Sequence, residues 1–108
     1  KGVFERDFGL KDQIRRASVS VMSNIAEGFE SKTHPQFIKY LGYAKASAGE
    51  VRSQLYVAHD LEYISSEDFN KAFALSERVS GQVARFIAYL ERTPQSRHIR
   101  EEGVEYET

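Results

Sequence analysis

Residues 37–60 read FIKYLGYAKASAGEVRSQLYVAHD, and this stretch decides the fold class of the chain. Apolar or small residues recur in it at alternating steps of four and three. They are Phe37, Leu41, Ala44, Ala48, Val51, Leu55 and Ala58. This pattern is a heptad seam of about three repeats, which is typical of a helix that packs lengthwise against other helices. The alanines within the seam predict that a neighbouring helix approaches closely.

The segments on either side of the seam also have helical periodicity. We predict helices at about residues 10–29, 34–63 and 66–92. Thr33 is the expected N-cap of the second helix, and Ser65 or Ser66 that of the third. Gly28 is expected to end the first helix, because glycine adopts the left-handed conformation without a side-chain penalty.

No stretch alternates apolar and polar residues in the manner of a strand, so the predicted fold class is all-α. Three long helices joined by short loops predict an antiparallel up-and-down bundle. Each helix carries more than one apolar stripe, which leaves a groove for a fourth helix. We expect that helix to lie upstream of residue 1 or to come from another chain.

Composition limits the classes of function. The 108 residues form one domain, with a bundle at 1–92 and a flexible acidic tail at 93–108. The absence of cysteine excludes disulfides, thiolate zinc sites and cysteine nucleophiles. No apolar run approaches the roughly 18 residues that span a bilayer, so we expect a cytoplasmic protein without membrane contact. Residues 1–100 hold 15 cationic and 12 acidic side chains, which makes the body mildly basic.

Three stretches resemble a known family. They are FGLKDQIRRA at residues 8–17, SNIAEGFE at 23–30 and GEVRSQLYVA at 49–58. Their order and spacing are similar to those of the bacterial four-helix-bundle proteins called 23S rRNA-intervening sequence proteins. The resemblance extends over about residues 4–92.

This resemblance implies a four-helix up-and-down bundle whose first helix precedes the FGLKDQ motif, and whose members associate as homopentamers. It further implies no established activity for most members. Some relatives are accessory proteins of diversity-generating retroelements, in which a basic pentamer engages a reverse transcriptase and nucleic acid. The expected partners are therefore further copies of this chain, together with RNA, DNA or a nucleic-acid-handling protein.

Six basic side chains are candidates for a phosphate-binding surface that an oligomer would repeat by symmetry. They are Lys11, Arg15, Arg16, Lys39, Lys45 and Arg52. The structural alternative is that Arg15 and Arg16 pair with Asp12, with Glu27 or with an acidic residue across a subunit contact. The direction of the arginine side chains separates the two interpretations.

Five polar side chains are candidates for a buried network that fixes the register of the first two helices. They are Asn24, Glu27, Glu50, Ser53 and Gln54. In this hypothesis Asn24 and Gln54 exchange hydrogen bonds. A carboxylate metal site on Glu27 and Glu50 is the alternative, but neither glutamate has the histidine three residues later that di-iron bundles use.

The sequence thus predicts a protein without catalytic residues, cofactor or metal. We expect an oligomeric four-helix-bundle binding protein that associates with nucleic acid or a ribonucleoprotein. The alternative is a structural scaffold or protein interaction module without a nucleic-acid role.

Overall fold

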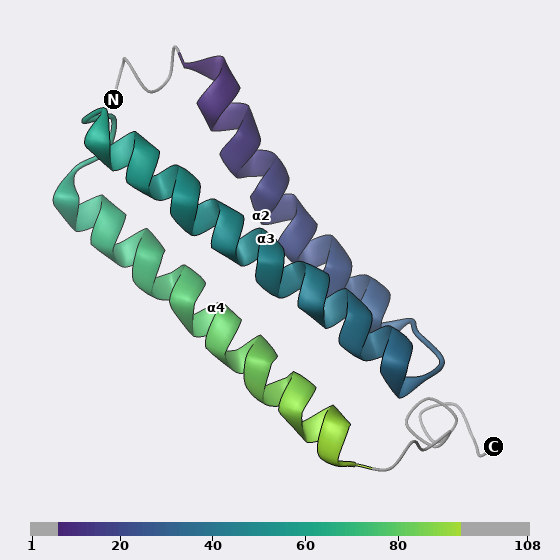
Figure 1. The fold of residues 1–108 in the computed structure, drawn as a ribbon. Coiled ribbons are helices and arrows are strands. Elements are labelled where there is room, and N and C mark those ends of the chain that lie inside the picture. Colours follow the sequence, from purple (N-terminus) through teal and green to yellow (C-terminus); the bar gives the residue numbers. More distant parts are fainter. Residues whose placement is uncertain (1–6, 94–108) are drawn as a thin grey trace.

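The computed structural model describes residues 7–93, and every regular element in this range is an α-helix. The helices are α2 (Phe8–Phe29), α3 (His34–Asp60) and α4 (Ser66–Arg92). Figure 1 shows α3 between α2 and α4, with neighbouring helices antiparallel. The predicted all-α bundle is confirmed. The predicted tail lies outside the described residues except for Thr93. None of the three helices is long and apolar enough to cross a membrane.

Side-chain N-caps fix where the helices begin. The hydroxyl of Thr33 accepts the backbone N–H of Gln36 at 3.2 Å, as expected for the start of α3. Ser65, and not Ser66, caps α4, because its hydroxyl accepts the backbone N–H of Asp68 at 3.0 Å. Each cap satisfies a backbone donor that has no partner within its own helix.

The C-terminus of α3 departs from the prediction, since the helix ends at Asp60 rather than at residue 63. Glu62 takes a left-handed conformation with φ of 61°. Its N–H donates to the His59 carbonyl and that of Tyr63 to the Ala58 carbonyl, both at 2.9 Å. These two bonds form a Schellman motif. No feature of the sequence predicted this motif, because glutamate stands where glycine is usual.

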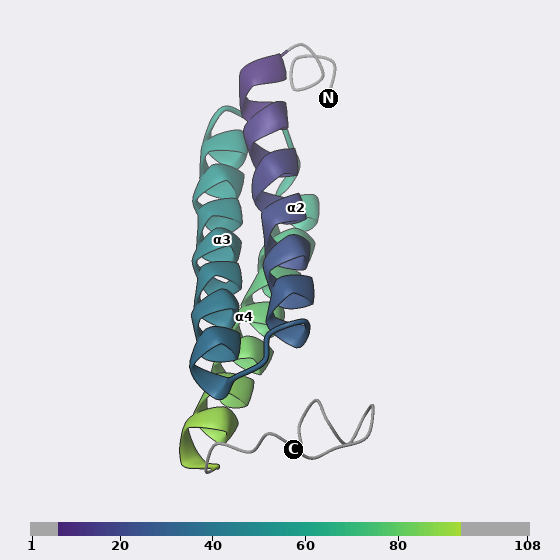
Figure 2. The ribbon, with the colours of Figure 1, turned by 90° about the vertical axis from the view of Figure 1, so that its right-hand side faces the viewer.

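The hydrophobic core lies at the end of the bundle where α2 ends and α3 begins. Its buried cluster consists of Phe37, Leu41, Val83 and Leu90. The ring centroid of Phe37 lies 5.1 Å from those of both Phe29 and Phe86. One aromatic ring from each helix therefore meets the others at this end. Figure 2 shows α4 passing behind α2 and α3.

The prediction that Gly28 ends the first helix was wrong. No glycine among the described residues has a positive φ, and α2 continues to Phe29. Gly28 is buried, and a Cβ on it would lie 2.8 Å from Cδ1 of Phe37 and 2.9 Å from Cε1. The glycine is required because the aromatic ring occupies the space of a side chain, and not because of its backbone conformation.

Replacing Gly28 by alanine is expected to destabilise the protein by about 1 to 3 kcal/mol, since the core ring must move to admit a methyl group. Gly42→Ala is the matched control, because nothing lies within 4 Å of a Cβ at that position in α3. We expect the control to stabilise the protein by up to about 1 kcal/mol through helix propensity. Urea denaturation of both variants checks the prediction, and two changes of the same sign would contradict it.

Candidate functional site

An apolar groove runs along the middle of the bundle and is lined by all three helices. Its largest side chains are Ile14 and Met22 of α2, Val51 and Leu55 of α3, and Leu75 and Val79 of α4. The groove has a volume of about 390 Å³. It forms because α2 and α4 both pack mainly on α3 and much less on each other. The rings of Phe29 and Phe86 meet at the end of the bundle where the three aromatic rings gather.

Two side chains that line this apolar groove are exposed although they are apolar. Met22 is 71% and Leu75 is 56% accessible to solvent. Burying a side chain of either kind stabilises a protein by roughly 1.5 to 3 kcal/mol. Covering the groove would therefore stabilise the bundle.

The two arginines of α2 pair with Asp12, one of the partners that the sequence suggested. Arg16 donates from Nε to Oδ2 at 2.9 Å, and Nη2 of Arg15 lies 3.6 Å from Oδ1. Both arginines stay open to water, with 79% and 71% of their side chains exposed. Exposed pairs of this kind contribute only about 0.3 to 0.5 kcal/mol each, so both guanidinium groups remain available.

Arg52 points away from α2 and toward α4. Its Nη1 donates to the carbonyl and hydroxyl oxygens of Ser76 at 3.2 and 3.1 Å, and to the hydroxyl of Ser80 at 2.8 Å. Lys45, two turns earlier on α3, lines the same crevice between α3 and α4. We call this feature, which Ser80, Gly81 and Glu77 also line, the α3/α4 crevice.

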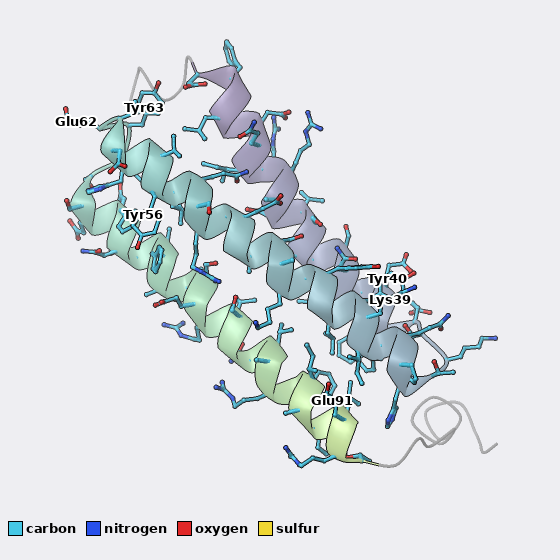
Figure 3. All side chains as sticks on the ribbon, viewed as in Figure 1. Lys39, Tyr40, Tyr56, Glu62, Tyr63 and Glu91 are labelled. Carbon is cyan, nitrogen blue, oxygen red and sulfur yellow. The ribbon has the colours of Figure 1, made fainter. Side chains whose placement is uncertain are left out.

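The six candidate basic residues thus do not form one patch. Lys11, Arg15 and Arg16 belong to α2, on the other side of α3 from the α3/α4 crevice. Lys39 lies near the start of α3 with its Nζ 5.2 Å from the centre of the Tyr40 ring, and Figure 3 shows the two side by side. Lys45 and Arg52 share the α3/α4 crevice, whereas Arg15 and Arg16 share Asp12.

The predicted polar network is only partly brought together. The amide of Asn24 donates to the carbonyl oxygen of Ser20 at 2.9 Å, and the Ser20 hydroxyl lies 2.8 Å from that of Ser47. These three side chains and Glu50 line one crevice between α2 and α3, which is separate from the α3/α4 crevice. Ser20 and Ser47 therefore tie the two helices together, although the sequence analysis did not single them out.

The other members of the predicted network lie elsewhere. Glu27 and Ser53 are exposed to solvent. Gln54 is partly buried, and its Oε1 has no hydrogen-bond partner, so it does not receive the amide of Asn24. Among residues 7–93, no three His, Asp or Glu side chains gather as ligands for a metal ion.

Asp7 connects the start of α2 to the turn between α3 and α4, a link that the sequence analysis missed. Its Oδ1 caps the helix by accepting the N–H of Leu10 at 3.1 Å, and its Oδ2 accepts the hydroxyl of Tyr63 at 2.9 Å. Figure 3 places Tyr63 beside Glu62 at this end of the bundle. An aspartate three residues before Leu10, where the predicted first helix begins, was the available signal.

The bond to Asp7 raises the pKa of Tyr63 above its usual value of 10.0, with burial and the aspartate charge adding to the effect. A raised pKa means that the bond stabilises the fold below pH 10 and that this contribution is lost as the pH rises through the higher value. We expect Asp7→Ala to return the Tyr63 pKa toward 10.0 and to cost about 1 kcal/mol through the lost cap.

The tyrosinate absorbance of wild type and Asp7→Ala checks this, with Tyr63→Phe in each background to isolate one ring. Asp7→Asn, which keeps a capping oxygen and removes the charge, is the control for the cap. The same Tyr63 titration midpoint with and without Asp7 would contradict the assignment.

Comparisons with known proteins agree with this geometry. The family model described as 23S rRNA-intervening sequence protein matches residues 2–85. The fold is similar to a crystal structure from Bacteroides thetaiotaomicron, of a protein with unknown function from the S23 ribosomal protein family. That similarity has a TM-score of 0.75 at 25% identity and covers 77% of each chain. No curated protein matches the chain. With most of its length matched, the chain belongs to the 23S rRNA-intervening sequence protein family.

Proposed function

We propose that this protein is a non-enzymatic subunit that acts by binding, as a four-helix bundle that self-associates. The observation that carries the proposal is the apolar groove, whose exposed Met22 and Leu75 lie on two different helices. An amphipathic helix laid between α2 and α4 would cover both. In this proposal the helix that occupies the groove is the fourth helix that the family places before the FGLKDQ motif.

The completed bundle associates, in this proposal, as the homopentamer that the family resemblance implies. Further exposed apolar side chains outside the groove support self-association, among them Val19, Tyr43 and Tyr89, which are 57%, 51% and 49% exposed. Obligate subunit interfaces are rich in such residues.

Light scattering on the intact protein, with any residues that precede Lys1, tests the proposal. We expect a mass close to five chains at micromolar concentration. A single-chain mass across the concentrations at which the protein stays folded would refute it.

Association with nucleic acid is the second candidate function. The exposed guanidinium groups of Arg15 and Arg16 favour it, since symmetry would repeat them around a pentamer. Against it, residues 7–93 hold eleven basic and eleven acidic side chains and so carry no net charge. Gel shifts with structured RNA and single-stranded DNA at two salt concentrations decide the question. Binding that does not weaken with salt would exclude a phosphate-contacting surface.

A further inference from the structure

Arg52 is a cation whose bonds to the protein use one side of the guanidinium only. All three of its hydrogen bonds leave from Nη1 and go to uncharged oxygens of Ser76 and Ser80. Ser80 is buried, and the hydroxyl of Ser76 is itself held by the carbonyl oxygen of Ala48 at 3.0 Å. The guanidinium is therefore fixed in orientation by groups on both helices.

This arrangement leaves the opposite edge of Arg52 for a ligand. The Nε and Nη2 groups form the side-on fork with which arginine binds two oxygens of a phosphate or carboxylate. Among the described residues, no carboxylate oxygen lies within 4.0 Å of the Arg52 guanidinium nitrogens, the limit for an ion pair. A partly buried guanidinium normally has such a counterion, since uncharged partners offset only part of the cost of leaving water.

The crevice that Arg52 lines is cationic. Lys45 lines it with Arg52, and Glu77 is the acidic residue that lines it. Two positive charges against one negative charge leave an excess of about one, which favours an anion. A phosphate has a third oxygen for Lys45 beside the two that the fork can hold, whereas a carboxylate has only two oxygens.

Gly81 forms part of the wall of the crevice, where it has no side chain to fill the space. The crevice measures about 320 Å³, which is room enough for a phosphate group with its water.

We infer that the α3/α4 crevice is a phosphate-binding site, in which the Nε and Nη2 groups of Arg52 hold two oxygens of the phosphate and Lys45 holds a third. The site is distinct from the apolar groove and from the arginines of α2. It takes either a free phosphate or one phosphate of a nucleic-acid backbone, because both present the same oxygens. It does not depend on the pentamer.

The Arg52 Nε–H resonance in a nitrogen-15 correlation spectrum reports the site directly. We expect inorganic phosphate to shift it to saturation, and sodium chloride at equal ionic strength to leave it in place. Arg52→Lys keeps the charge but removes the fork, and it should weaken phosphate affinity by about tenfold or more. Because this variant lacks the Nε–H group, its affinity is read from the backbone amide resonance of Gly81, which also lines the crevice, in the variant and in wild type. Arg78→Gln is the matched control, because it removes a cation of α4 that does not line the crevice. It should leave the affinity unchanged.

A short oligonucleotide added in place of inorganic phosphate separates the two sources. A shift with the oligonucleotide at lower concentration assigns the site to nucleic acid, and a shift with inorganic phosphate alone assigns it to a free phosphate. No saturable shift with either probe would overturn the inference. It would also be overturned if the resonance moved only with protein concentration, since a carboxylate of a second copy would then occupy the fork.

Discussion

Placing charges in the apolar groove with Met22→Glu and Leu75→Glu is expected to abolish assembly of the intact protein. Covering the groove with a fourth helix would leave both carboxylates without a cation partner among its apolar walls. An unpaired buried charge costs at least about 3 kcal/mol. The helix would therefore stay out of the groove, and the four-helix bundle that the proposed pentamer requires would not be complete.

Light scattering and thermal unfolding of the same samples measure this effect. Ser23→Glu is the matched control, because Ser23 lies on the same helix as Met22, is exposed and does not line the groove. A control that keeps its fourth helix unfolds near the wild-type temperature. A groove variant that unfolds like the control would show that the groove stays open in the intact protein.

Replacing Phe37 by alanine is expected to lower the free energy of unfolding by about 3 to 5 kcal/mol. Its ring is 5% exposed and contacts aromatic rings of both other helices. The aromatic end is the place where α2 and α4 meet through their rings, so the loss extends to the docking of all three helices. Such a loss approaches the whole stability of many small domains.

Denaturant unfolding checks this value, and Phe37→Leu gives a milder variant in case the alanine form does not fold. Phe8→Ala is the control, because that ring is 72% exposed and its removal should change stability by less than about 0.5 kcal/mol. Equal losses from the two positions would mean that the aromatic core is not formed as described.

A double-mutant cycle between Gly28 and Phe37 joins two of these results. The cost of a methyl group at Gly28 comes from the ring that it would strike at 2.8 Å. In the Phe37→Ala background that ring is absent, so adding the methyl group should then cost little or stabilise the helix.

The sequence identified several residues of the candidate site but not the partners that orient them. Arg52 was identified as a candidate phosphate ligand, but its direction depends on Ser76 and Ser80, which lie 24 and 28 residues later in the chain. The role of Ser20 was missed for the same reason, because its partner Ser47 lies on another helix. The residues next to a polar side chain in the sequence do not indicate which helix that side chain will face.

By itself the sequence determined the helices, the N-cap Thr33 of α3, the apolar seam of α3 and the presence of a groove for a further helix. The cap and the seam depend on residues three or four positions apart, which meet within one helix wherever it packs. Only the tertiary structure decided that Gly28 is a packing glycine, that Arg52 turns toward α4 and that the groove lies between α2 and α4. Those outcomes are set by contacts between helices, where the shape and distance of a partner far away in the chain determine what a residue does.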